Sequence, residues 1–143
     1  MFVKQISAFV ENKSGKLVEI IGILADNNID ISALSIADTT DFGILRLIVN
    51  DPEKAQTVLK EQGIIVKATD VIALAVPDRP GGLVSVLALL KDKGVAVEYM
   101  YAFVGKSDRG AMVIIKTDKP DEAVSVLKTN NADVVSAEDV YNL

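Results

Sequence analysis

Hydrophobic and polar residues follow two different periods along this chain, and the order of these periods predicts its secondary structure. Residues 5–10 are short and β-prone, and residues 17–24 then place apolar side chains at the i, i+3, i+4 and i+7 spacing of a helix face. Residues 29–37 and 42–49 are strand-like, with a polar break at residues 38–41 between them. The pattern therefore predicts a strand, a helix and a pair of strands.

Capping and turn residues indicate where these elements end. Ser14 is a candidate N-cap for the first helix, and the polar residues 26–28 are expected to stop it. Residues 51–53, with the sequence DPE, predict the start of a second helix, because proline suits the first turn and acidic side chains suit the positive end of the helix dipole. Gly63 is expected to end that helix, and residues 64–66 are expected to form a fourth strand.

The same series of elements occurs a second time. Residues 71–135 repeat the pattern of residues 5–67 at an offset of about 66, which grows through small loop insertions. Matched pairs include Ile6 with Ile72, Gly15 with Gly81, Leu24 with Leu90, Gly43 with Gly110 and Pro52 with Pro120. In the second copy the predicted elements span residues 71–76, 80–93, 95–104, 110–117, 119–130 and 132–135. We expect two modules, residues 1–69 and 70–143, with a break near Thr69 and Asp70 that is too short for a flexible linker.

A βαββαβ unit of this length predicts a ferredoxin-like module, in which both helices cover one face of an antiparallel sheet. The predicted fold class is therefore α+β, with two such modules in tandem. Both faces of residues 44–49 and 111–115 are apolar, whereas an antiparallel sheet with helices on one side ordinarily has a polar second face. We expect the other repeat and a second chain to cover these faces, giving a homodimer or a higher homo-oligomer. Gly22, in the middle of a predicted helix, is interpreted as a point of close helix packing.

The residue types present narrow the possible functions, because this fold hosts many unrelated ones. The chain has no cysteine and no histidine, so a thiolate metal site and a Ser–His or Cys–His nucleophile are excluded, and no cofactor or metal is expected. An enzyme that uses carboxylates such as Glu98 and Asp108 remains a minor alternative. The net charge of −5 opposes nucleic-acid binding, and Tyr99, Tyr101 and Phe103 are interpreted as packing residues rather than as a base-stacking surface.

The hydropathy of the chain predicts a folded protein without a membrane-spanning helix. Half of the residues are hydrophobic and the mean hydropathy is +0.32, so a packed core is expected. The most apolar windows, residues 17–25 and 83–90, are far shorter than the roughly 18–20 residues of a membrane-spanning helix. Residues 1–4 lead into a strand without the apolar segment of a signal peptide. The expected location is the cytoplasm.

Two related motifs open the first helix of each repeat. Residues 78–83 have the sequence DRPGGL, and residues 12–17 have the sequence NKSGKL. The N–H groups and the dipole of a helix N-terminus attract a carboxylate, and glycine lets a ligand approach the backbone closely. The side-chain oxygen of Asn12 or Asp78 can accept a hydrogen bond from an ammonium group. These turns therefore suit a free amino acid, although the same residues also suit an ordinary tight turn.

An acid or amide, two residues, Gly, one residue and Leu, at the same point of a duplicated βαββαβ unit, resembles the ACT domain. The resemblance covers essentially the whole chain, twice, and Ser14 stands where proline is commoner in the family. It extends to the regulatory portions of aspartokinase and phosphoglycerate dehydrogenase and to the small subunit of acetolactate synthase, without an attached catalytic domain.

The resemblance implies a non-catalytic regulatory protein that binds a free amino acid and modulates a partner metabolic enzyme by allostery. It also implies that the effector lies between this turn and the start of the second strand of a neighbouring ACT module. The candidate binding residues are Asn12, Ser14, Gly15, Lys16, Leu17, Ile29, Asp30, Ile31, Asp78, Pro80, Gly81, Gly82, Leu83, Val95 and Val97. The alternative is a subunit that mediates oligomerisation without binding a ligand.

Overall fold

The computed structural model describes residues 2–38, 41–105 and 107–143. The chain divides into two compact units, which we call the first and the second module. The first module comprises Lys4–Thr69 together with Tyr141–Leu143, and the second comprises Asp70–Val140 together with Phe2 and Val3. Each module therefore includes a few residues from the far end of the chain.

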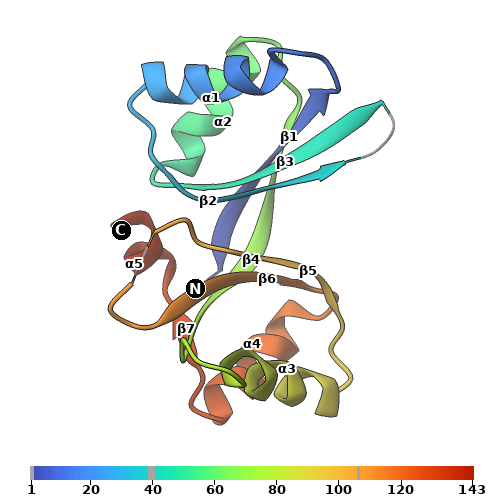
Figure 1. The fold of residues 1–143 in the computed structure, drawn as a ribbon, viewed down its shortest axis with the longest axis vertical. Coiled ribbons are helices and arrows are strands. Elements are labelled where there is room, and N and C mark those ends of the chain that lie inside the picture. Colours follow the sequence, from blue (N-terminus) through green and yellow to red (C-terminus); the bar gives the residue numbers. More distant parts are fainter. Residues whose placement is uncertain (1, 39–40, 106) are drawn as a thin grey trace. The chain divides into compact units, whose positions relative to one another are not determined.

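The first module has the predicted alternation of strands and helices. Its elements are β1 (Val3–Glu11), α1 (Lys16–Asp26), β2 (Ile31–Asp38), β3 (Phe42–Val49), α2 (Pro52–Glu61) and the first residues of β4 (Val66–Val76). The strands follow the order β2–β3–β1–β4, and β3 is antiparallel to both β2 and β1. Both helices lie on one face of the sheet (Figure 1). The buried core consists of Ile6, Ala8, Ile20, Leu24, Ile29, Leu45, Leu47, Val49, Ala55 and Leu59.

The second module repeats this arrangement. Its elements are the rest of β4, α3 (Gly82–Asp92), β5 (Val97–Ala102), β6 (Ala111–Thr117), α4 (Pro120–Thr129), β7 (Asp133–Val135) and a short α5 (Ala137–Tyr141). Its strands follow the order β7–β4–β6–β5. When the four strands of each module are numbered along the chain, both sheets have the strand order 4-1-3-2, which is the ferredoxin-like order. The structure confirms the predicted α+β class with two tandem modules, whereas α5 has no counterpart in the sequence-based prediction.

The junction between the repeats differs from the prediction. Two separate strands were expected there, at residues 64–66 and 71–76, but β4 runs without interruption from Val66 to Val76. Thr69 and Asp70 lie inside this strand. The eleven residues of β4 contain neither glycine nor proline, and Asp70 is the single residue among them of a type that favours turns.

The two helix starts of the first module show one wrong and one correct prediction. Gly15, rather than Ser14, is the N-cap of α1, and it lies in the left-handed region with φ of 86°. Glycine adopts this conformation without steric cost, so the chain turns there. α2 starts at Pro52 as expected, and Asp51 caps it, because its Oδ1 accepts a hydrogen bond from the Lys54 N–H at 3.1 Å.

Strand pairing also corrects the predicted match of Gly43 with Gly110. Gly43 pairs with Val10 in the first module, whereas Val76, the counterpart of Val10, pairs with Ala111. Ala111 is therefore the structural counterpart of Gly43, and the second hairpin carries its glycine one residue earlier. Matching glycines by residue type alone misplaced this hairpin by one position.

Burial data correct one further interpretation. No atom lies within 4 Å of a Cβ built on Gly22, so the close helix packing inferred for this glycine is wrong. In β3 and β6, Leu47, Ile48, Ile114 and Ile115 are at most 1% exposed. In the described residues, no helix is long and apolar enough to cross a membrane.

Candidate functional site

The turns that open α1 and α3 have nearly the same backbone conformation. Gly15 has φ of 86° and ψ of −10°, and Gly81 has φ of 87° and ψ of −11°. Both turns also contain the same pair of backbone hydrogen bonds. In the first turn, Lys13 N donates to Glu11 O at 2.7 Å and Lys16 N donates to Lys13 O at 3.3 Å. In the second turn, the matching bonds run from Arg79 N to Pro77 O at 2.9 Å and from Gly82 N to Arg79 O at 3.0 Å. The duplication seen in the sequence therefore extends to the geometry of these turns.

Both turns are open to a ligand. No atom lies within 4 Å of a Cβ built on Gly15 or Gly81, and Asn12 and Asp78 are exposed. The Asn12 N–H donates to the Asp41 carbonyl oxygen at 3.1 Å, which fixes the start of the first turn. Lys16 N and Gly82 N, the first amides of the two helices, donate within the turns. The amides that follow them in the first helical turn have no acceptor within their own helix, and a helix N-terminus of this kind attracts an anion.

Gly82 has a structural role that the sequence did not reveal. A Cβ built on Gly82 would lie 2.0 Å from the Pro77 carbonyl oxygen. This is far inside any normal contact, so the backbone of the second turn requires glycine at this position. The first module has Lys16 at the equivalent place, so the two turns differ in how tightly the helix start packs against the preceding strand.

The second-strand residues named from the family resemblance lie elsewhere in each module. Ile29 and Val95 are almost fully buried in the two cores, and Asp30 is exposed. Ile31 and Val97 begin β2 and β5 and are half-buried. Within one module these residues and the turn are at opposite ends of the first helix, which at 1.5 Å per residue is about 16 Å long. A single module therefore does not bring the two halves of the candidate site together.

A groove lies beside each turn, bounded by the end of the module's first strand, its first helix and the segment before its last strand. The first groove has a volume of about 180 Å³ and is lined by Phe9, Val10, Glu11, Lys16, Glu19, Ile20, Phe42, Gln62, Gly63, Ile64 and Ile65. The second groove has a volume of about 550 Å³ and is lined by Ala75, Val76, Pro77, Ser85, Val86, Leu89, Arg109, Asn130, Asn131, Ala132 and Asp133. Sequence reasoning missed both grooves, because their walls combine segments about fifty residues apart in the chain.

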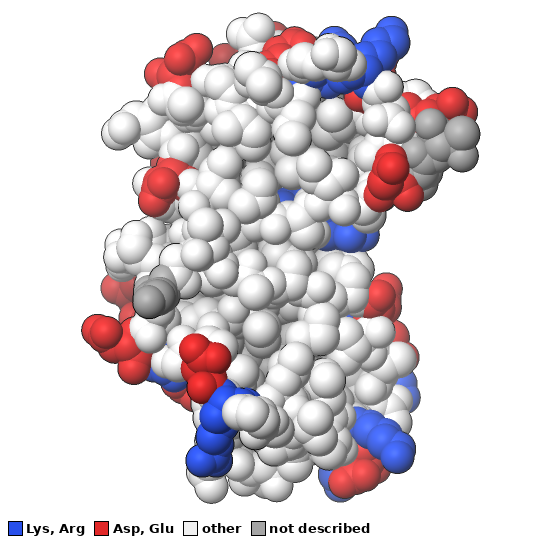
Figure 2. Space-filling view, in the orientation of Figure 1, with Lys and Arg blue, Asp and Glu red and all other residues white. Residues whose placement is uncertain are grey.

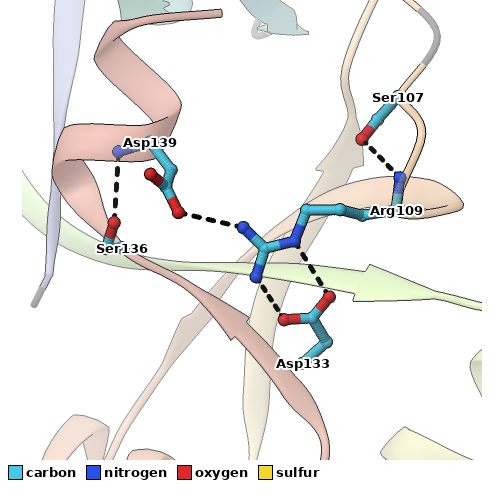
Figure 3. A network of polar contacts seen from close by, with 5 residues as sticks. All are labelled: Ser107, Arg109, Asp133, Ser136 and Asp139. Atoms are coloured by element: carbon cyan, nitrogen blue, oxygen red, sulfur yellow. Dashed lines mark hydrogen bonds and ion pairs between the residues drawn. The ribbon is translucent and has the colours of Figure 1, made fainter.

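Arg109 and Asp133, which line the second groove, belong to an ion-pair network (Figure 3). The Arg109 guanidinium donates from both Nε and Nη2 to the Asp133 carboxylate, and its Nη1 donates to Asp139 Oδ2 at 3.0 Å. The hydrogen bond to Asp133 is the main cause that raises the pKa of Arg109 above its ordinary value. Ser136 Oγ accepts from the Asp139 N–H at 3.1 Å and so fixes the start of α5. The network holds β7 and α5 to the residues that precede β6.

Charged groups at the first turn form smaller pairs. Glu11 lies 2.9 Å from Lys13, and this hydrogen bond, with the positive charges of Lys13 and Lys16, lowers the pKa of Glu11. Lys16 lies 3.4 Å from Glu19. On the face seen in Figure 2, acidic and basic side chains lie in small separate groups, unlike the continuous basic surface that binds a phosphate backbone.

The described residues contain no group of three or more acidic, histidine or cysteine side chains placed to hold a metal ion. Glu98, one of the two carboxylates considered for catalysis, lies 3.5 Å from Lys116 in an exposed ion pair. Asp108, the other, is exposed on the segment before β6. The structure does not bring these two carboxylates into a common cavity among those that its described residues line.

Comparisons with known proteins agree with this architecture. The family model of the ACT domain pair matches residues 1–143. Among solved structures, protein BT0572 from Bacteroides thetaiotaomicron is 44% identical, with 100% of this chain and 98% of that chain covered and a TM-score of 0.93. The regulatory subunit of aspartate kinase from Thermus thermophilus in its ligand-free form is 14% identical, with 90% and 93% covered and a TM-score of 0.62. Its counterpart from Thermus flavus is 11% identical, with 92% of each chain covered and a TM-score of 0.60.

The two more distant matches share the fold of this chain, and in both of those proteins it forms the regulatory subunit of aspartate kinase. No curated protein matches the chain. The chain belongs to the family of ACT domain pairs, as the motifs at residues 12–17 and 78–83 indicated.

Proposed function

We propose that this chain is a non-catalytic regulatory protein that binds a free amino acid at one or both of the turns before α1 and α3. The observation that carries the proposal is the pair of matching left-handed glycines, Gly15 and Gly81, each with open space beside it and a helix start behind it. The ligand carboxylate is bound by the helix amides, and Asn12 or Asp78 accepts a hydrogen bond from its ammonium group.

Binding then modulates a partner metabolic enzyme by allostery. The two solved aspartate kinase regulatory subunits share this fold, which supports a regulatory role. Because one module keeps the turn and the start of the second strand at opposite ends of its first helix, the complete site takes its second half, residues 29–31 or 95–97, from a neighbouring module. We therefore expect a homodimer or a higher homo-oligomer.

A thermal-shift screen of the chain against the twenty amino acids tests the binding. A ligand at a thousand times its Kd should add about 4 kcal/mol to the free energy of unfolding. Asp78→Ala should weaken binding by roughly 10- to 100-fold, because it removes a charge-assisted hydrogen bond, while leaving the fold intact. Gly81→Val should abolish binding. A Gly81→Val variant that folds and binds as the parent does would exclude the second turn as a site.

The exposed edge of the first module favours the alternative of an assembly subunit without a ligand. Leu34 and Ile36 lie on β2, the last strand in its sheet order, and are 38% and 52% exposed. An edge strand with exposed apolar side chains readily pairs with another chain. If no amino acid stabilises the protein while light scattering gives a mass of at least twice 15.3 kDa, the assembly role replaces the sensing role.

A further inference from the structure

One face of the first module's sheet carries no helix (Figure 1). Ile6 and Ala8 of β1 belong to the core beneath the two helices. Successive side chains of a strand point to opposite faces, so Ser7, Phe9 and Glu11 lie on the other side of the sheet. We call this side the helix-free face.

A row of apolar side chains crosses the helix-free face. Phe9 pairs with Ile44 of β3, which in turn pairs with Ala37 of β2. On the opposite side of β1, the Phe9 N–H donates to the carbonyl oxygen of Ile65, directly before β4, at 3.0 Å. Val66 packs against the core, so the side chain of its neighbour Ile65 points to the helix-free face. Directly paired residues share a face, and these four side chains therefore form one continuous row, which we call the apolar row.

The apolar row belongs to an exposed end of the helix-free face. Phe9 and Ile65 are 46% and 69% exposed, and Phe42, beside the row on β3, is 52% exposed. Gln5 and Ile48, farther along the same face, are fully buried. Single exposed apolar residues are ordinary, but a contiguous group of them marks a surface for another molecule.

The second module does not repeat this group. Phe9 and Ile65 correspond by strand pairing to Ala75 and Asp133, which lie opposite each other on β4 and β7. Asp133 is held in the ion pair with Arg109. The same fold therefore forms with a methyl group and a carboxylate at these two positions, so large apolar side chains are not required there for folding.

Charged side chains border the apolar row with opposite signs. Glu11 lies on one side of the row, where its carboxylate is 2.9 Å from Lys13. A carboxylate accepts several hydrogen bonds, so the contact with Lys13 leaves Glu11 able to bind a second cation. On the other side, two residues beyond the row, lie Arg46 of β3 and Lys67 of β4, of which Lys67 is the more exposed. One border of the row is therefore acidic and the other is basic.

This pattern is complementary to itself. A two-fold axis along the apolar row, between two sheets stacked about 10 Å apart, places the row of one copy on the row of the other. The same axis brings Glu11 of each copy over the border that carries Arg46 and Lys67 of the other copy. Within one chain, Glu11 and Lys67 are about 13 Å apart along the strands, at about 3.3 Å per residue, so contact between them is disfavoured there.

We propose that the exposed end of the helix-free face binds the same surface of a second copy of this chain. The apolar row forms the centre of the contact, and Glu11 of each copy binds Lys67 and Arg46 of the other copy at its edge. A self-complementary patch of this kind gives a closed two-fold dimer. The contact uses neither the turns before α1 and α3 nor residues 29–31 and 95–97, so it goes beyond the proposed amino-acid sensing and does not depend on it.

Light scattering over a range of protein concentrations, with a matched pair of variants, tests the surface. The wild-type protein should reach at least twice the chain mass of 15.3 kDa. Ile65→Asp puts a charge into the apolar row, whereas Val18→Asp puts it on α1, on the helix-covered side of the sheet, at a side chain that is 77% exposed. Ile65→Asp should raise the dimer dissociation constant roughly tenfold or more, and Val18→Asp less than about twofold. Circular dichroism should show both variants folded, since neither residue belongs to a buried core.

Charge reversal tests the two-fold arrangement. Glu11→Lys and Lys67→Glu should each raise the dissociation constant, by roughly three- to tenfold, because each places like charges opposite each other. The double variant should return to within about threefold of the wild-type value, because its new lysine meets the new glutamate of the other copy. The loss of the Glu11–Lys13 pair is common to Glu11→Lys and the double variant, so it does not produce this recovery.

The other outcomes overturn the proposal in separate ways. A wild-type protein that stays at the mass of one chain at every concentration excludes the contact. An Ile65→Asp variant that assembles as the wild type does places the contact elsewhere, and a double charge variant no better than the single ones excludes the two-fold pairing. The thermal-shift screen judges amino-acid sensing independently. A chain that assembles through this surface, but that no amino acid stabilises, leaves the contact standing and ends the sensing proposal.

Discussion

Replacing Gly82 with alanine should destabilise the protein, although alanine is ordinarily the better helix residue. Gly82 is the first residue of α3, and a Cβ there would lie 2.0 Å from the Pro77 carbonyl oxygen and 3.0 Å from the Pro77 carbonyl carbon. Both atoms belong to the backbone, so no side-chain rotation relieves the overlap. Either the end of β4 or the start of α3 has to move by more than 1 Å, and overpacking of this kind costs about 1–3 kcal/mol.

Gly22→Ala is the matched control for this experiment. Gly22 lies inside α1 with nothing within 4 Å of its built Cβ, so alanine should raise the free energy of unfolding by about 0.5–1 kcal/mol through helix propensity alone. Urea denaturation followed by circular dichroism measures both variants, and the midpoints should move in opposite directions at unchanged slope. A Gly82→Ala variant as stable as the parent, or more stable, would refute the steric reasoning.

Four further substitutions test two helix caps and two sets of ion pairs. Asp51→Ala should lower the free energy of unfolding by about 1 kcal/mol, because it removes the α2 cap. Lys119→Asp should raise it by about 1 kcal/mol, because Lys119 is the N-cap of α4 and makes no capping bond there. Thermal unfolding measures both variants. Arg109→Met should lower stability by about 1 kcal/mol in dilute buffer and by less in 1 M salt, since its partners are exposed. The lowered pKa of Glu11 stabilises the folded state above the ordinary glutamate pKa, and this contribution is lost as the pH falls through the lowered value. Glu11→Gln should therefore lose less stability on acidification through that range in urea titrations.

The fold could be predicted from the sequence because its signals are local. Ile20 and Leu24 in α1 and Val86 and Leu90 in α3 keep helical spacing, and all four are buried as this spacing predicts. The DPE sequence at residues 51–53 predicted the start of α2, which the structure has at Pro52. These features depend on neighbours within one or two helical turns, so a single sequence is enough to find them.

The continuity of β4 and the presence of α5 depend on tertiary contacts instead. Nothing local distinguishes a strand that continues through Thr69 and Asp70 from two strands joined by a short turn. α5 is only five residues long, which is too short to be stable alone. It is held by the buried side chain of Val140 and by the Arg109–Asp139 ion pair, which joins residues thirty positions apart.

The candidate site was predictable to the same limited extent. The two turns could be located from their glycines, but the grooves beside them could not, because Phe9, Phe42 and Ile65 come from three different segments. Phe9 and Phe42 were visible in the sequence only as two aromatic residues in strands. What places them in one groove is the pairing of β1 with β3 and of Phe9 with Ile65, which is long-range information.

A comparison of the two modules separates the residues that the turn requires from the residues that can be changed to test ligand binding. Gly15 and Gly81 differ by 1° in φ and in ψ, although the grooves beside the two turns differ in volume and in lining residues. The same backbone is thus present beside both grooves, so the glycines by themselves do not distinguish a turn that binds a ligand from one that does not. A valine at either glycine adds about 1–2 kcal/mol of left-handed strain besides blocking a ligand. Asp78→Ala therefore gives a cleaner test of binding than Gly81→Val, because it leaves the backbone of the turn intact.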